Sequence, residues 1–223
     1  MIVGHYAASF LGKAMAPQVP LWHLMIAAQV VDFAWATFIL VGIEHSAIVP
    51  GATRAFPFDF YDIPYSHSLL TLGVWVIGSF WLYGLLIGRR WRQGALVFAL
   101  VVASHWFLDL LVHAEDLPLT PTSDIKFGFA LWNLPLFEFC LEFGLLLLCV
   151  AIYARANNIS MRRLRSVELW ILVVMLCIHG YFYSGYYTHS MRVVAVLVLI
   201  GYAFVVWFTY RQTRTFRSQM AVG

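Results

Sequence analysis

One short segment holds three side chains that could share a metal ion. In SHWFLDLLVH, His105, Asp109 and His113 follow one another at intervals of four residues. In a helix each such step turns the side chain by about 40°, so all three lie along one stripe. Neutral imidazole and carboxylate are ligands that Zn²⁺ and related divalent metals take in hydrolytic sites. The spacing predicts metal ligation; the alternative is that Asp109 only pairs with the two histidines and orients them across a helix interface.

Three residues outside this segment could complete such a site. Asp32 lies in AAQVVDFAW, where it could ligate a metal, relay a proton or serve as a hydrogen-bonded packing residue. His67 lies in PYSHSLL, either as a ligand or as the neighbour of a helix start at the flanking serines. His5 lies in GHYAASF, and its role depends on how the N-terminal helix is placed.

Glu138 and Glu142 form an acidic pair with helical i, i+4 spacing. Two carboxylates this close do not both stay ionised unless a cation or a histidine lies nearby. They are the candidate catalytic residues, because either could act as a general base, add a metal ligand or hold a ligand histidine in one tautomer. Glu44 and His45, at the outer end of the first predicted span, are expected to be solvated, with a functional role as the alternative, and His179 is expected to be a bundle histidine.

The elements that position these residues are predicted to cross a membrane. Of 223 residues, 62% are hydrophobic and 11% charged, whereas a soluble domain has close to half apolar and about a quarter charged residues. Apolar runs long enough to cross the roughly 30 Å hydrocarbon layer recur along the chain. We predict an all-α fold, a polytopic transmembrane helix bundle of about six spans in a single integral membrane domain, 1–223. The predicted spans are 21–43, 66–88, 93–113, 129–153, 168–187 and 191–211, which form a bundle over 21–211, with a short N-terminal helix in 1–16 and a basic tail at 212–223.

The basic residues predict the orientation of the bundle. Nearly all Lys and Arg residues fall on one side of the predicted spans; the exceptions are Arg54, Lys126 and Arg192. The basic side, which includes the C-terminal tail, is assigned to the cytoplasm, and loops 44–65 and 114–128 to the outside. Three prolines and five aromatic residues in segment 50–65 predict an ordered cap rather than a flexible tether.

The N-terminal helix is too short to span a membrane comfortably. At 1.5 Å per residue, its 16 residues would reach about 24 Å. It either enters the membrane from the cytoplasm as a half-helix or lies flat in the interface. On the same scale Asp32, His105 and Glu142 lie about 18 to 20 Å from the cytoplasmic ends of their spans. Charged groups at that depth persist chiefly where they pair, bind an ion or line a cavity.

The motifs as a set resemble a known family. GHY at His5, Asp32 on the first span, SHSLL at His67 and the segment SHWFLDLLVH resemble the predicted membrane-bound metal-dependent hydrolases, also described as LexA-binding, inner-membrane-associated hydrolases. The similarity covers about residues 1–150. It implies a hydrolase of the bacterial inner membrane whose metal-binding set is His5, Asp32, His67, His105 and Asp109.

These observations favour a metal-dependent hydrolase embedded in the membrane. A divalent metal, foremost Zn²⁺, would be held by His105, Asp109, Asp32 and either His67 or His5. A site near the outer face suits an amphiphilic or lipid-linked substrate among membrane lipids. No nucleic-acid partner is expected, because the basic residues form short clusters between apolar runs.

Two other classes of function remain open. The same acids and histidines could relay protons or pass metal ions in a carrier or channel. The chain could also be an accessory subunit of a membrane complex, with a purely structural metal. No G-x-S-x-G, G-x-x-x-x-G-K-[ST] or G-x-G-x-x-G motif is present, which disfavours a serine hydrolase, an NTPase and a dinucleotide enzyme.

Overall fold

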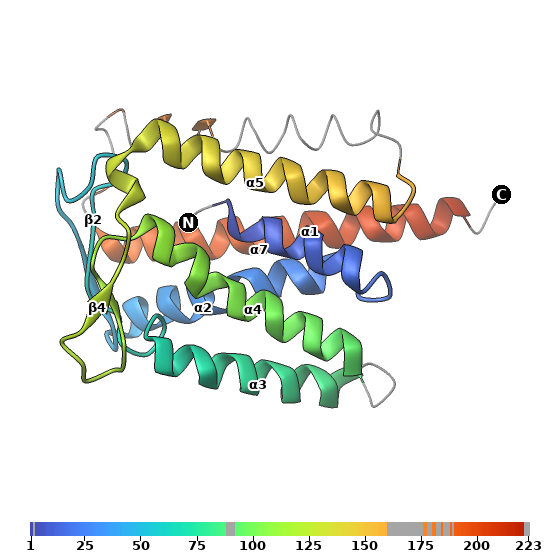
Figure 1. Cartoon of the computed structure of the whole chain (residues 1–223), viewed down its shortest axis with the longest axis horizontal. Helices are drawn as coiled ribbons and strands as arrows, with labels where there is room; N and C mark the ends of the chain where they lie inside the picture. Colours follow the sequence, from blue (N-terminus) through green and yellow to red (C-terminus); the bar gives the residue numbers. More distant parts are fainter. Residues whose placement is uncertain are drawn as a thin grey trace.

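The apolar runs fold into long helices that lie roughly along one direction (Figure 1). The computed structural model describes residues 1, 3–87, 92–159, 176–177, 180–181, 184, 188 and 190–220, with side chains as far as Gln212. Within these residues, five helices are long and apolar enough to cross a membrane: α2 (Leu21–Val41), α3 (Leu69–Ile87), α4 (Arg92–Val112), α5 (Pro135–Ala156) and the Met191–Gln212 part of α7 (Met191–Met220). The predicted all-α membrane bundle is therefore confirmed. The predicted span 168–187 falls mostly outside the described residues, and His179 falls entirely outside them.

The short N-terminal helix α1 (His5–Met15) lies inside the bundle, where it packs against α2, α4 and α5 (Figure 1). Its close approach to α4 requires a glycine, because a Cβ at Gly12 would lie 2.9 Å from a methyl group of Val101. Ser9 Oγ donates a hydrogen bond of 2.8 Å to the backbone oxygen of Leu24 on α2. This packing places α1 among the other helices and brings His5 into the bundle.

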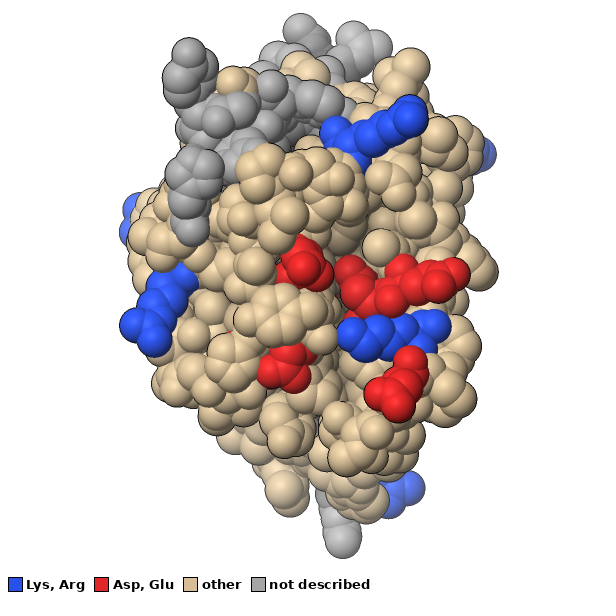
Figure 2. Space-filling model, turned by 90° about the vertical axis from the view of Figure 1, so that its left-hand side faces the viewer, with Lys and Arg blue, Asp and Glu red and all other residues tan. Residues whose placement is uncertain are grey.

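Two small antiparallel sheets close the end of the bundle at the left of Figure 1. Strands β1 (His45–Ile48) and β2 (Phe58–Asp62) form one sheet, and β3 (Leu117–Pro118) and β4 (Lys126–Phe127) form the other. Phe56, Phe60 and Ile63 are buried beneath this end. The predicted ordered cap is present, although its strands were not predicted. Figure 2 looks onto this end and shows Asp and Glu side chains grouped near its middle.

Helix boundaries differ from the predicted ones where the local backbone leaves the helical region. The span predicted to begin at residue 129 begins at Pro135, after Ala130 with a φ of 57° and a short 3₁₀ turn, η2 (Leu131–Asn133). A residue that precedes proline is disfavoured in the α region, so the helix starts at the proline. Helix α3 starts at Leu69 because the Ser68 hydroxyl accepts a hydrogen bond from Thr71 N, as an N-cap does.

Candidate metal centre

Five of the predicted ligands meet where α1, α2 and α4 pack together. His5 begins α1, Asp32 lies in the second half of α2, and His67 precedes α3 by two residues. His105 and Asp109 lie one turn apart on α4. All are buried, except that Asp32 keeps 14% of its side chain exposed. Residues from widely separated parts of the chain therefore form one polar cluster inside an apolar bundle.

Four ligand atoms converge at the core of this cluster. Nε2 of His105 lies 3.1 Å from Asp109 Oδ2 and 3.4 Å from Asp32 Oδ1. Nε2 of His67 lies 3.5 Å from each of the same two oxygens. Ligands that surround Zn²⁺ tetrahedrally at 2.0 to 2.1 Å are separated from one another by about 3.3 to 3.4 Å. These four N···O separations are close to that value, and we call His67, His105, Asp32 and Asp109 the four-ligand core.

The outer ring nitrogens of the two core histidines are occupied by hydrogen bonds. His105 Nδ1 lies 2.8 Å from the backbone oxygen of Ala28, which can only accept, so Nδ1 is the donor. His67 Nδ1 lies 2.7 Å from Ser66 Oγ, which itself donates to Glu44. In the neutral rings, Nε2 therefore presents a lone pair toward the carboxylates. Partners of this kind fix the tautomer of metal-ligating histidines.

The core atoms lack the hydrogen bonds that burial normally demands. His105 Nε2 and Asp109 Oδ2 are both buried and neither makes a hydrogen bond, although they lie 3.1 Å apart. Lone pairs that face one another in an apolar interior are unfavourable unless a proton or a metal cation lies between them. Imidazole nitrogen and carboxylate oxygen are ligands for Zn²⁺ and similar ions. The residues present therefore fit a divalent metal.

Asp109 turns its second oxygen toward a different set of groups. Oδ1 lies 3.1 Å from His5 Nε2 and 3.8 Å from His113 Nε2, and it accepts a hydrogen bond from the amino group of Met1. The rings of His5 and His105 are stacked in parallel with 3.8 Å between their centroids. His113, the third residue of the predicted stripe, thus joins the cluster at Asp109 and does not approach Asp32 in the same way.

Glu44 is a residue whose role was predicted wrongly. It was expected to be solvated at the outer end of α2, but it is fully buried. Its carboxylate accepts hydrogen bonds from Tyr65 N and Ser66 N, both 2.7 Å, and from Ser66 Oγ at 2.6 Å. The turn before α3 folds over Glu44, and the bonds compensate its burial. His45, by contrast, is exposed as predicted and pairs with Asp62.

The acidic pair on α5 is buried, and one member positions the N-terminal segment. Oε2 of Glu142 accepts hydrogen bonds of 2.8 Å from both Val3 N and Gly4 N, directly before His5. Glu138 is also fully buried, in the first turn of α5. Through these contacts Glu142 holds the backbone directly before His5, and the roles predicted for the pair stay predictions.

A tyrosine that the sequence did not single out contacts the core. Tyr202 on α7 donates a hydrogen bond of 2.7 Å from its hydroxyl to Asp32 Oδ2. This leaves Asp32 Oδ1 to face the two core histidines. Tyr202 lies in an apolar run with other aromatic residues. Only its hydrogen bond to Asp32, 170 residues away in the chain, distinguishes it from them. The last described span therefore contributes to the site, which the family resemblance did not imply.

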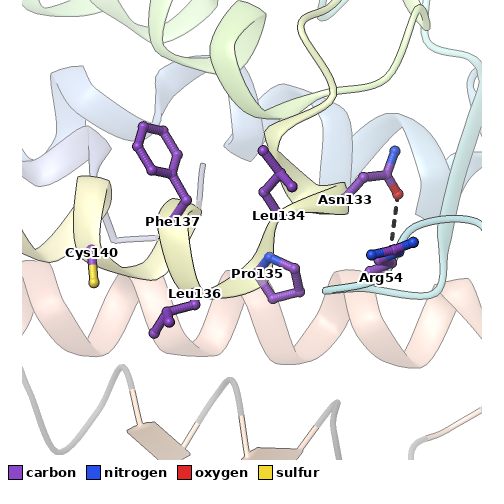
Figure 3. A pocket seen from close by; sticks show the side chains of 7 residues that line it. All are labelled: Arg54, Asn133, Leu134, Pro135, Leu136, Phe137 and Cys140. Atoms are coloured by element: carbon purple, nitrogen blue, oxygen red, sulfur yellow. Dashed lines mark hydrogen bonds between the residues drawn. The ribbon is translucent and has the colours of Figure 1, made fainter.

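An apolar groove lies on the flank of the bundle next to the centre. It is lined by residues 133–137, Cys140 and Arg54, whose backbone nitrogen donates to Asn133 Oδ1 (Figure 3). The adjoining Trp132 is buried and places its ring 4.3 Å from that of His113. One tryptophan thus connects the wall of the groove to the polar cluster.

Comparison with models of known protein families, with curated proteins and with solved structures finds no match for this chain. The residues and their geometry are therefore the basis for the function.

Proposed function

We propose that this integral membrane protein is a metal-dependent hydrolase that acts on an amphiphilic or lipid-linked substrate. The observation that supports it most is the four-ligand core, with N···O separations of 3.1 to 3.5 Å in a buried site. Histidine and carboxylate are ligands of catalytic Zn²⁺ sites, and water or substrate would take a further coordination position beside the four protein ligands.

The core residues would hold the ion, and its chemistry would be that of a Lewis acid. Bound there, a divalent ion polarises a carbonyl or phosphoryl group and makes water more acidic. Asp32 is the core residue with the most exposed side chain, 14% against at most 4% for the other three. A substrate would therefore reach the core beside Asp32, and Tyr202 would hold the aspartate in position.

The proton acceptor is proposed on α5. Glu138 and Glu142 stay the candidates, since both are buried on α5, which packs against α1. Glu142 also accepts the two backbone hydrogen bonds from Val3 and Gly4. Replacement of Glu142 would hence disturb the placement of His5 as well, whereas replacement of Glu138 would test proton transfer more directly.

The choice of an amphiphilic substrate depends on the surroundings of the core. The site is enclosed by helices that are long and apolar enough to cross a membrane. The nearby groove offers an apolar wall with Arg54 at one end (Figure 3), which suits a chain with an anionic head. Such a substrate could stay in the lipid while its polar bond reaches the polar cluster.

Metal analysis of detergent-purified protein tests the proposal first. Wild type, His105→Ala and the control His45→Ala would be checked for monodispersity, and their zinc content measured after reconstitution. We expect zinc in wild type and His45→Ala and its loss in His105→Ala. Hydrolysis of fluorescent phospholipids and of acyl esters in mixed micelles should follow the same order. Absence of bound metal in wild type, with pH-driven or metal-driven flux in proteoliposomes, would instead favour a carrier.

A further inference from the structure

The two oxygens of Asp109 face two different groups of ligands. Oδ2 belongs to the four-ligand core, whereas Oδ1 faces His5 and His113. We propose that Asp109 bridges two divalent cations, the second held by Oδ1, His5 and His113. This inference rests on the proposed function for its first ion, and it adds a second ion to the same site.

His5 has the environment of a ligand without its metal. Its side chain is 1% exposed, and neither ring nitrogen makes a hydrogen bond. Its Nε2 points to Asp109 Oδ1 at 3.1 Å, as that of His105 points to Oδ2. A buried imidazole with two unsatisfied nitrogens is costly, and a cation beside Nε2 would remove half of that cost.

The stacking of His5 on His105 suits two ions side by side. The two rings are parallel within 4° and their centroids are 3.8 Å apart. Each presents Nε2 to a different oxygen of the same carboxylate. Ions in two-metal sites lie about 3.5 to 4 Å apart. One carboxylate with two stacked imidazoles thus provides one ligand pair for each ion.

His113 is oriented as metal-ligating histidines usually are. Its Nδ1 donates to Asp116 Oδ1 at 2.8 Å, so Nε2 is left to face Asp109 Oδ1 at 3.8 Å. The ring is held between Trp132, at 4.3 Å, and Phe60, at 4.9 Å. A histidine that only filled space would not need Asp116 at its Nδ1 and Asp109 facing its Nε2.

Asp116 adds a second carboxylate on this side of Asp109, behind His113. Asp116 keeps 16% of its side chain exposed, and Asp and Glu side chains are grouped on the end of the molecule that Figure 2 shows. Negative charge at that end would draw divalent ions toward His113. The amino group of Met1 also donates to Asp109 Oδ1, so a cationic group already lies there in this structure. That amino group and a second ion are the competing occupants.

Counting the bound ions distinguishes these occupants. Wild type, His113→Ala and the control His45→Ala would be loaded with Mn²⁺ in detergent, and the ions per chain measured by elemental analysis. We expect about two ions in wild type and in His45→Ala and about one in His113→Ala. Electron paramagnetic resonance should show exchange-coupled Mn²⁺ in wild type and uncoupled Mn²⁺ in His113→Ala.

A second variant keeps the test valid if His113→Ala is not monodisperse. Asp116→Asn retains His113 but weakens its orientation, and should lower the affinity for the second ion by about 10- to 100-fold. One ion in wild type, unchanged in His113→Ala, would overturn the second ion and leave the proposed function intact. Two ions in both proteins would overturn the role of His113. No ion in wild type would overturn both proposals.

Discussion

Two histidine–aspartate pairs in this molecule use the same side chains in opposite ways. His45 and Asp62, on the cap, are about half exposed and joined by a hydrogen bond of 2.7 Å. His105 and Asp109, in the bundle, are 0% and 2% exposed, and their facing atoms lie 3.1 Å apart with no hydrogen bond. The exposed pair is joined by its own hydrogen bond, whereas the facing atoms of the buried pair make none. Residue type alone therefore does not distinguish the two pairs; burial and the missing hydrogen bond do.

The largest expected effect is the loss of metal binding when Asp109, from the buried pair, is replaced. Asp109→Asn should abolish metal binding and hydrolysis, because Asp109 supplies an oxygen to the core and the amide is a weaker ligand. Affinity should fall by more than the roughly 10- to 100-fold that loss of an outer hydrogen-bond partner costs. Zinc titration and elemental analysis measure it, with Asp62→Asn as the matched control. Full zinc content in Asp109→Asn would refute the metal centre.

A smaller loss of zinc affinity is expected when Ser66, the hydrogen-bond partner of His67, is replaced. Ser66→Ala removes the hydroxyl that accepts from His67 Nδ1 and donates to Glu44. We expect zinc affinity to drop by about 10- to 100-fold, because the imidazole is no longer fixed in one tautomer. Ser66→Thr keeps a hydroxyl and should restore most of the affinity, and Ser46→Ala on the cap is the control. Equal affinity in Ser66→Ala and Ser46→Ala would mean that the hydroxyl has no part in the site.

A still smaller effect is expected at Tyr202. Tyr202→Phe removes one hydrogen bond to Asp32 but leaves every core ligand in place. Zinc affinity should fall by about 10-fold or less, at the low end of the range for outer partners. Isothermal titration would compare it with Tyr210→Phe, further along the same helix. A loss of zinc as large as that of Asp109→Asn would show that Tyr202 does more than orient Asp32.

The smallest effect on zinc binding is expected when His45, from the exposed pair, is replaced. His45→Ala breaks the pair with Asp62 on the cap, where water solvates both groups. Zinc content and hydrolysis should be unchanged, and the free energy of unfolding should change by about 0 to 1 kcal/mol. Denaturant titration in detergent would give the second value. Loss of zinc in His45→Ala would mean that the cap pair is not independent of the centre.

Much of the fold follows from patterns that are local in sequence. The apolar runs predict α2, α3 and α4 to within a few residues, because a membrane requires about 20 consecutive apolar residues in a helix. The start of α5 was missed because Ala130, with its positive φ, and the 3₁₀ turn after it lie within the apolar stretch that predicted the helix. The strands of the cap were missed because they are short and pair through a loop.

The candidate site, too, was predictable only where its residues are close in sequence. The stripe of His105, Asp109 and His113 is visible because all three lie on one helix, at a spacing that any α-helix turns into proximity. Glu44 and Tyr202 were misjudged or missed, because their partners lie 22 and 170 residues away in the chain. No local pattern signals a hydrogen bond of that kind.

The sequence by itself determined the membrane helices and the residue types that could ligate a metal, since both depend on composition and short-range periodicity. Only the tertiary structure decided that α1 enters the bundle and stacks His5 on His105, and that Glu44 is buried behind His67. It also decided that Asp109 directs its two oxygens to different partners. Helix packing sets these distances, and side chains far apart in the sequence meet only when the helices do.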